Sequence, residues 1–190
     1  MLRMFTAFSG YDSQCLALNR IGVDYDLIGW SEIDKYAIKA HNALFPQYAE
    51  RNYGDISHID WESVPDFDLF TYSFPCTDIS TAGQQKGLTE GSGTRSSLLW
   101  ECRKAIEAKR PRFLIMENVK ALVSEKFMPL FQEWEAYLRG LGYTNYSAVL
   151  NAKDYGVPQN RERVFMVSVF GGGGTNFHTK KRTTNAFAMC

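Results

Sequence analysis

Short apolar runs alternate with longer amphipathic segments through most of the chain. Apolar runs of about four to eight residues, rich in β-branched and aromatic side chains, are typical of buried strands. Apolar residues at every third or fourth position are typical of helices that cover a sheet. The clearest helical pattern spans 126–141, and Gly142 follows it as a C-cap. The order of the segments predicts an α/β fold with three α/β/α layers and a mostly parallel sheet.

Turn and cap residues set the expected boundaries of these elements. Gly22 and Gly142 follow two of the helical patterns, and Pro46 and Pro111 end two others. Ser31 is the expected N-cap of the second helix. The expected strands are 3–8, 25–30, 67–72, 112–116, 143–150 and 163–170, and the expected helices are 13–21, 34–45, 95–109 and 126–141.

The character of the sequence changes near its C-terminus. Gly171 to Gly174 form a run of glycines, and the residues that follow show no apolar periodicity. The basic triplet Lys180-Lys181-Arg182 is consistent with a solvated charge cluster. We expect one folded domain over 1–170 and a flexible, glycine-rich and basic tail over 171–190.

The composition excludes some classes of protein. The 190 residues include 21 Lys+Arg and 21 Asp+Glu, so the formal net charge is zero, and 45% of the residues are hydrophobic. This balance excludes a highly charged disordered segment. It also argues against a protein that binds nucleic acid over its whole surface, although a local basic patch is compatible with it.

The cysteines are scattered along the sequence. Cys15, Cys76, Cys102 and Cys190 form no Cys-x-x-Cys pair, and the histidines do not lie near them at ligand spacing. We therefore expect no metal site and a reducing compartment. No apolar run reaches the length of a membrane span, and the first apolar stretch is too short for a signal peptide. We expect a cytoplasmic protein that makes no membrane contact.

Polar residues that could bind a nucleoside follow the first two strands. Phe8-Ser9-Gly10 forms a small loop before a helix, but its single glycine does not fit the dinucleotide-binding fingerprint. Glu32 follows the second strand, where an acid can accept hydrogen bonds from ribose hydroxyls. Asp55, in Gly54-Asp55-Ile56, is a candidate acceptor for an adenine amino group; a surface acid and a turn aspartate are the alternatives. With no P-loop in the sequence, the pattern favours an adenosine-containing ligand without three phosphates.

Cys76 differs from the other cysteines in its setting. It follows Pro75 in a polar loop after the strand 67–72, whereas Cys15 and Cys102 lie on apolar helix faces as expected of core residues. A phosphatase loop would place an arginine where Ala82 stands, and no histidine lies in a context that supports a cysteine protease. Cys76 is therefore a candidate nucleophile of another kind.

Two further charged segments are candidates for the same site. Glu117-Asn118-Val119 follows the apolar strand that we expect to end at Met116. In Gln159-Asn160-Arg161-Glu162-Arg163 the two arginines alternate with Glu162, so in a strand both face one side. The alternatives are a surface carboxylate for Glu117 and an exposed, charged strand entry for the arginines.

Taken together, these motifs resemble the catalytic region of the cytosine-C5 DNA methyltransferases. The resemblance covers about residues 3 to 170, and it implies the Rossmann-like fold of class I S-adenosylmethionine-dependent methyltransferases over a catalytic domain of 1–170. The matching segments, in family order, are Phe8-Ser9-Gly10, Ser31-Glu32-Ile33-Asp34, Gly54-Asp55-Ile56, Phe74-Pro75-Cys76, Gly93-Thr94-Arg95-Ser96-Ser97-Leu98, Glu117-Asn118-Val119 and Gln159-Asn160-Arg161-Glu162-Arg163.

The resemblance implies a role for each catalytic candidate. The Cys76 thiolate would attack C6 of a cytosine, which makes C5 nucleophilic. Glu117 would contact N3 and the exocyclic amine, and Arg163 would bind O2 with electrostatic support from Arg161. S-adenosylmethionine would supply the methyl group and leave as S-adenosylhomocysteine. The target base would flip out of double-stranded DNA to reach this site.

The resemblance also implies a set of cofactor-binding residues and shows departures from the family pattern. The implied set is Phe8, Ser9, Gly10, Asp12, Ser13, Glu32, Ile33, Asp55, Ile56, Pro75 and Leu98. Thr6 stands where the family usually has an acid, Asp12 and Ser13 where it has glycines, and Ile33 where it has an aromatic residue. After Cys76 the usual glutamine and phenylalanine are Thr77 and Ile79.

Members of this family usually continue beyond the last motif with a target-recognition domain and a segment that closes the cofactor pocket, and neither is expected in this sequence. Three interpretations follow: one subunit of a split methyltransferase completed by a second chain, a truncated fragment, or a non-catalytic binding subunit. Transfer RNA is an alternative substrate, since a branch of the family uses it. The resemblance is to enzymes of the bacterial or phage restriction-modification type.

Overall fold

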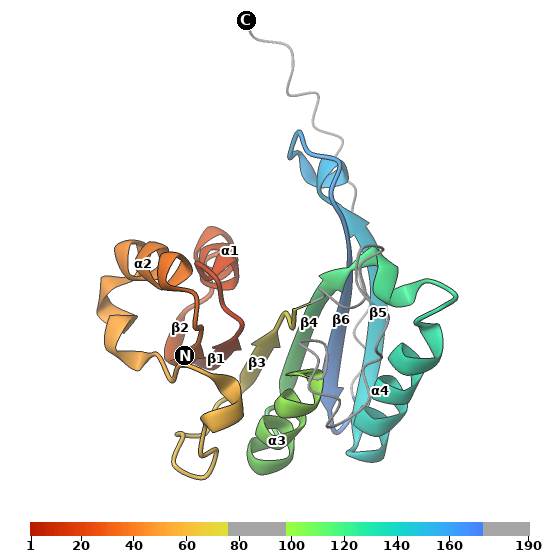
Figure 1. The fold of residues 1–190 in the computed structure, drawn as a ribbon, viewed down its shortest axis with the longest axis horizontal. Coiled ribbons are helices and arrows are strands. Elements are labelled where there is room, and N and C mark those ends of the chain that lie inside the picture. Colours follow the sequence, from red (N-terminus) through yellow and green to blue (C-terminus); the bar gives the residue numbers. More distant parts are fainter. Residues whose placement is uncertain (76–97, 173–190) are drawn as a thin grey trace, which may run out of the picture.

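The computed structural model describes residues 1–75 and 98–172, which form a six-stranded sheet flanked by helices (Figure 1). The strand order is β2-β1-β3-β4-β6-β5. The first four strands are parallel, β6 runs antiparallel to β4, and β5 runs antiparallel to β6. The strands are β1 Leu2–Ala7, β2 Tyr25–Ser31, β3 Leu69–Tyr72, β4 Phe113–Val119, β5 Tyr143–Asn151 and β6 Glu162–Phe170.

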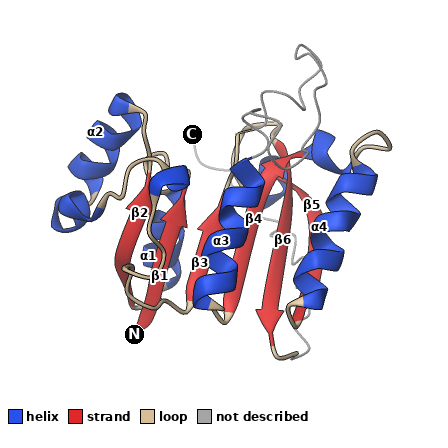
Figure 2. Ribbon diagram, turned by 60° about the horizontal axis from the view of Figure 1, so that its bottom comes forward, coloured by secondary structure: helices blue, strands red, loops and turns tan. Residues whose placement is uncertain are grey.

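In the described part of the chain, α-helices cover both faces of the sheet (Figure 2). α3 and α4 lie against one face, and α1 and α2 lie on the other side, towards the β2 edge. The helices are α1 Ser13–Ile21, α2 Lys35–Leu44, α3 Leu99–Lys109 and α4 Met128–Gly140. The three-layer α/β/α arrangement with a mostly parallel sheet agrees with the expected fold class.

Alternation along the strands supplies a hydrophobic core on each face of the sheet. In β1, Met4 belongs to the cluster under α1 and α2, whereas Phe5 belongs to the larger cluster under α3 and α4. Both side chains are fully buried. Successive side chains of a strand point to opposite faces, so a strand buried on both sides carries a continuous apolar run.

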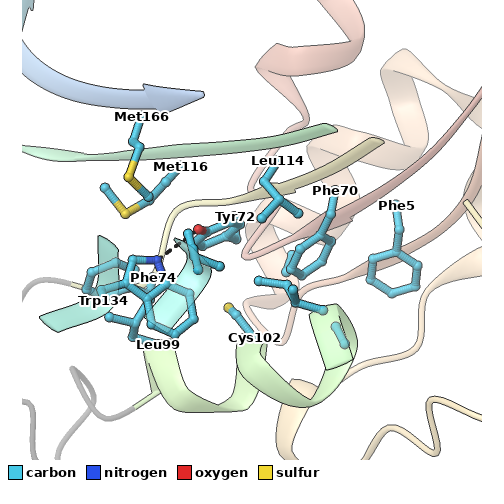
Figure 3. Packing of buried hydrophobic residues seen from close by; sticks show 14 of the residues in the cluster. Phe5, Phe70, Tyr72, Phe74, Leu99, Cys102, Leu114, Met116, Trp134 and Met166 are labelled. Atoms are coloured by element: carbon cyan, nitrogen blue, oxygen red, sulfur yellow. Dashed lines mark hydrogen bonds between the residues drawn. The ribbon is translucent and has the colours of Figure 1, made fainter. Parts of the chain in front are cut away.

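The larger core packs aromatic rings and sulfur-containing side chains between α3, α4 and the sheet (Figure 3). Trp134 of α4 lies edge-on to Tyr72 of β3, with ring centroids 6.2 Å apart. The indole Nε1–H of Trp134 donates a hydrogen bond of 3.1 Å to the hydroxyl of Tyr72. Burial raises the pKa of Tyr72 well above its ordinary value, so the hydroxyl stays neutral and accepts this bond.

The structure changes three local expectations. Asp34 rather than Ser31 caps α2, because its carboxylate accepts the backbone N–H groups of Tyr36 and Ala37. β4 continues past Met116, because its last residues pair antiparallel with the start of β6. β6 begins at Glu162, so Arg161 precedes the strand and the expected alternation does not reach it.

Most of the predicted C-terminal tail and the start of one predicted helix lie outside the described residues. The predicted helix 95–109 is described only from residue 98, where it agrees with the sequence pattern. The predicted tail over 171–190 is described only at Gly171 and Gly172, so its flexibility stays a prediction.

Replacing Tyr72 with Phe tests the polar contact in the core. The substitution leaves the buried Trp134 N–H without its acceptor, so we expect Tyr72→Phe to lower the free energy of unfolding by about 1–3 kcal/mol. Urea denaturation followed by tryptophan fluorescence measures the change. Tyr36→Phe makes the same chemical change on a ring that is 70% exposed, and it should stay within about 0.5 kcal/mol of the parent. Equal losses in the two variants would contradict the assignment.

Candidate active site

A cavity of about 620 Å³ lies at the carboxyl edge of the parallel strands. Parallel pairing puts the ends of β1, β2 and β3 at this edge, and the loops that follow them form the wall. The residues around the cavity are Phe8, Ser31, Glu32, Ile33, Asp34, Gly54, Asp55, Ile56, Ser57, Ser73, Pro75 and Leu98.

The turn after β1 brings its backbone towards Glu32. Phe8 and Gly10 both have left-handed backbone conformations, with φ of 54° and 57°. Glycine adopts this region without steric cost, whereas phenylalanine does so rarely. The turn directs the N–H of Gly10 at Glu32, whose Oε2 accepts it at 2.9 Å.

Backbone donors fix the carboxylate of Glu32. Its Oε1 accepts the N–H groups of Ile33 and Asp34 at 2.8 and 2.9 Å, while Oε2 accepts from Gly10. Each carboxylate oxygen can accept about two hydrogen bonds, so the group keeps capacity for a ligand. An acid held in this way is a preorganised acceptor for paired hydroxyl groups.

Asp55 is held by a local turn. Its Oδ1 accepts both the backbone N–H and the hydroxyl of Ser57, at 2.9 and 2.7 Å. These two bonds, the backbone bond first, lower the pKa of Asp55 below its ordinary value, so the group stays ionised near neutral pH. Among the described residues both bonds go to Oδ1, so Oδ2 keeps its acceptor capacity in a residue that lines the cavity.

Most of the sequence-predicted cofactor residues lie around this cavity. Those that line it are Phe8, Glu32, Ile33, Asp55, Ile56, Pro75 and Leu98. Gly10 contributes through its bond to Glu32, but Ser9 and Asp12 are 5% and 0% exposed, and the Ser13 hydroxyl bonds to Gln14. The structure therefore does not place Ser9, Asp12 and Ser13 in the cavity wall.

Other residues of the cavity wall were missed in the sequence. They are Ser31, Asp34, Gly54, Ser57 and Ser73. The first three stand within the matching motifs, whereas Ser57 and Ser73 directly flank a motif, and this position was their only sequence signal. The Asp55 segment also does not follow a sheet strand of its own; it lies beside β2 through a single parallel bridge between Trp30 and Asn52.

Asp12 instead anchors a buried polar group beneath the turn. Its Oδ2 accepts the hydroxyl of Thr6 at 2.9 Å and lies 3.5 Å from Nε2 of His41. All three side chains are fully buried, and Trp30 stacks on the His41 ring at 3.7 Å. Thr6, where the resemblance leads us to expect an acid, thus contacts the carboxylate of Asp12.

Glu117 and Arg163 form an ion pair where β4 and β6 meet. Nε of Arg163 lies 3.1 Å from Oε1 of Glu117, and the side chains are 23% and 25% exposed. Val119 pairs with Arg163 and Glu117 with Phe165, so the two charged groups are diagonal neighbours on one sheet face. Antiparallel pairing therefore brings together two residues that were predicted from separate motifs.

Asn118 connects this pair to the segment before Cys76. Its buried Nδ2 donates a hydrogen bond of 3.1 Å to the carbonyl of Phe74, and Pro75 lines the cavity. Cys76 is the next residue in the sequence but lies outside the described residues. The predicted site residue Arg161 is exposed, and its backbone N–H donates to the Asn151 side chain.

Neither a metal cluster nor a membrane span is found in the part of the chain that the structure describes. Over 1–75 and 98–172, no group of three or more His, Cys, Asp or Glu side chains is placed to bind a metal ion. Within the same ranges, no helix has the length and hydropathy that crossing a bilayer needs.

Comparison with known proteins agrees with the motifs and the geometry. The family model described as C-5 cytosine-specific DNA methylase matches residues 2–187. The chain belongs to this family. Among its relatives, the type II methyltransferase M2.ScrFI of Lactococcus lactis subsp. cremoris is 41% identical over 89% of this chain and 61% of that protein. The orphan methyltransferase M.SssI of Spiroplasma monobiae is 45% identical over 67% of this chain and 34% of that protein.

These values confirm the predicted family and show that the chain spans less than two thirds of the length of these methylase relatives. A solved structure, the S. pombe Dnmt2 methyltransferase, superposes with a TM-score of 0.72 at 20% identity, over 92% of this chain and 51% of that one. This likeness confirms the predicted methyltransferase fold.

The buried group at Thr6 makes a testable contribution to the stability of this methylase domain. Thr6→Val leaves the Asp12 carboxylate without its hydroxyl donor, so we expect the free energy of unfolding to fall by about 1–3 kcal/mol. Thr71→Val is a matched control, because Thr71 pairs with Thr6 in the sheet and its buried hydroxyl has no partner among the described residues.

Urea denaturation compares the two variants. The control should keep or slightly raise the stability of the parent, since it removes a buried hydroxyl that makes no hydrogen bond within 1–75 and 98–172. A loss for Thr71→Val as large as that for Thr6→Val would show that the hydroxyl–carboxylate bond is not the cause.

Proposed function

We propose that this chain carries the catalytic centre for methyl transfer from S-adenosylmethionine to C5 of cytosine in DNA, with Cys76 as the nucleophile. One observation carries the proposal. The hydrogen bond from Asn118 to Phe74 joins the strand end that bears the Glu117–Arg163 pair to the segment that leads through Pro75 into Cys76. The candidate base-binding pair and the segment that leads to the candidate nucleophile thus lie at the edge of the sheet that carries the ligand cavity.

The hydrogen-bond acceptors and apolar side chains of the cavity fit S-adenosylmethionine. Glu32 offers a fixed carboxylate to the two ribose hydroxyls, and Oδ2 of Asp55 offers an acceptor to the adenine amino group. Phe8 and Ile56 supply apolar contact for the adenine ring. When bound, the cofactor supplies an electrophilic methyl group on a sulfonium centre.

The chain's own chemistry begins at the nucleophile. The Cys76 thiolate adds to C6 of the cytosine ring, which moves electron density to C5 and N3 and makes C5 reactive. After C5 has gained its methyl group, a water molecule takes the C5 proton, and the electron pair of that C–H bond restores the C5–C6 double bond and expels the Cys76 thiolate. The enzyme is then free and the product is 5-methylcytosine.

Glu117 and Arg163 suit the two polar edges of the base. Glu117 binds or protonates N3 and accepts from the exocyclic amine, which offsets the charge that forms on the ring. Arg163 donates to O2, and its ion pair with Glu117 orients both groups in advance. Arg161 is proposed to add positive charge near the bound base.

The substrate in this proposal is double-stranded DNA with the target cytosine flipped out, at a cost of a few kcal/mol. The proposal includes a second chain that supplies target recognition, because this chain matches only 61% of the length of the type II relative M2.ScrFI. We also propose a cytoplasmic role of the type II or orphan kind, because relatives with these names come from bacteria and phages. The competing proposal is a silent binding subunit.

Transfer of labelled methyl groups tests the reaction. The chain is incubated with methyl-labelled S-adenosylmethionine and either DNA or transfer RNA, with Cys76→Ser and Cys190→Ser in parallel. We expect label in DNA, a loss of at least about a thousandfold for Cys76→Ser, and no change for Cys190→Ser, which lies outside the catalytic motifs. DNA that contains 5-fluorocytosine should trap a covalent adduct with the parent chain, because fluorine at C5 cannot leave as the proton does.

Three results would contradict this proposal in different ways. Label only in transfer RNA would overturn the DNA substrate. Transfer that survives in Cys76→Ser would overturn the nucleophile. Binding of S-adenosylhomocysteine without transfer, with or without candidate partner chains, would favour the silent subunit.

Asp55→Asn tests the adenine acceptor. The substitution keeps one acceptor oxygen for the two Ser57 bonds but puts an NH2 donor in place of Oδ2, and this group cannot accept from the adenine amino group. We therefore expect at least about tenfold weaker binding of S-adenosylhomocysteine by calorimetry. Asp60→Asn is the control, because Asp60 accepts the Glu62 N–H in a similar turn away from the cavity.

The Asp55 carboxylate also determines how binding of S-adenosylhomocysteine depends on pH. Because the pKa of Asp55 is lowered from 3.8, the carboxylate persists from pH 5 to 8 and its contribution is lost only as the pH falls below about 4. Affinity of Asp55→Asn equal to that of the parent at pH 7 would contradict the assignment.

A further inference from the structure

The side chain of Asn52 joins the two acid-bearing segments of the cavity. Its Oδ1 accepts the backbone N–H of Glu32 at 3.2 Å and that of Gly54 at 2.9 Å. Its Nδ2 donates to the carbonyl of Glu32 at 3.1 Å. One amide group therefore binds both backbone groups of the ribose-site acid and the N–H immediately before the adenine-site acid.

Asn52 lies where the backbone pairing between the two segments ends. The segment runs parallel to β2 through the Trp30–Asn52 bridge, and the Tyr53 N–H donates to the Trp30 carbonyl at 2.8 Å. Past this bridge, the Asn52 amide and the Ser31 hydroxyl, which donates to the Gly54 carbonyl at 2.7 Å, hold the segments together. The side chains thus replace a β-ladder at the edge of the cavity.

The spacing of Glu32 and Asp55 depends on this arrangement. Glu32 is bound by Asn52 at its backbone and by Gly10 at its carboxylate. Gly54 has a φ of 71°, so the chain turns sharply between the amide and Asp55. A rigid ligand that bonds to both acids needs them at one fixed separation, and preorganised acceptors bind more tightly because less ordering is required.

We propose that Asn52 is a positioning residue for the adenosine half of the cofactor: its amide fixes Glu32 relative to Asp55 without contacting the ligand itself. The inference rests on the proposed binding of S-adenosylmethionine at this cavity. It adds a residue that does not line the cavity and that was not among the sequence-predicted site residues.

Binding of S-adenosylhomocysteine to the full chain, measured by calorimetry, tests the role of Asn52. We expect Asn52→Ala to weaken binding at least about tenfold and to weaken binding of free adenosine by a similar factor. Asn145→Ala is the matched control, because its Nδ2 donates to the Glu135 carbonyl at 2.9 Å between β5 and α4, far along the sheet from the cavity. The control should lose comparable thermal stability and keep the parent's affinity.

A double-mutant cycle separates positioning from general destabilisation. If Asn52 acts through Glu32, Asn52→Ala should cost clearly less affinity in a Glu32→Ala background than in the parent. Asn52→Asp keeps the acceptor for both N–H groups but puts an oxygen against the Glu32 carbonyl, so it should fold and still bind at least about threefold more weakly.

The binding measurements distinguish a failure of the Asn52 proposal from a failure of the proposed function. Parent-like affinity in Asn52→Ala or Asn52→Asp, or fully additive losses in the cycle, would overturn the positioning role and leave the proposed function standing. A parent chain that binds neither S-adenosylhomocysteine nor adenosine would overturn the proposed cofactor, and the positioning role with it.

Discussion

The parallel pairing of β1 to β4 is the constraint on which the rest of the molecule depends. It brings the carboxyl ends of four strands to one edge, so that Glu32 after β2, Pro75 after β3 and Glu117 near the end of β4 share this edge although they are far apart in the sequence. Parallel strands need long crossovers, and these crossovers supply the helices of both outer layers. The same constraint makes strands buried on both faces, which explains why a polar group such as Asp12 on the α1 side must find partners within the protein.

Most of the fold could be predicted because each element carries a local signal. The strongly apolar segment 112–116 indicated a strand, and the spacing of Phe131, Trp134 and Leu138 indicated a helix against the sheet. The helix ends could be predicted from the glycine or proline that comes shortly after each helix. The family motifs then identified which loops meet at the carboxyl edge, because their order matches the order of the strands.

The misplaced features all depend on non-local pairing or on side-chain bonds. The extension of β4 to Val119 and the exclusion of Arg161 from β6 both follow from the antiparallel register, which pairs Val119 with Arg163. Asp12 looked like a ligand-loop residue, but its left-handed backbone turns the carboxylate inward to Thr6. Asn52 carried no signal, because an asparagine that bonds to backbone looks the same in sequence as any surface asparagine.

The Glu117–Arg163 pair shows why stability alone does not account for the site. A pair that is about a quarter exposed contributes roughly 0–1 kcal/mol to folding, since water screens it and ordering two long side chains costs entropy. The buried aromatic core contributes more to the stability of the fold than this ion pair does. In the proposed reaction a bound base would exclude water from the pair, and the same charges would interact more strongly at a lower effective dielectric constant. The partial exposure that limits the contribution of the pair to folding therefore fits the proposed contact of both groups with a base.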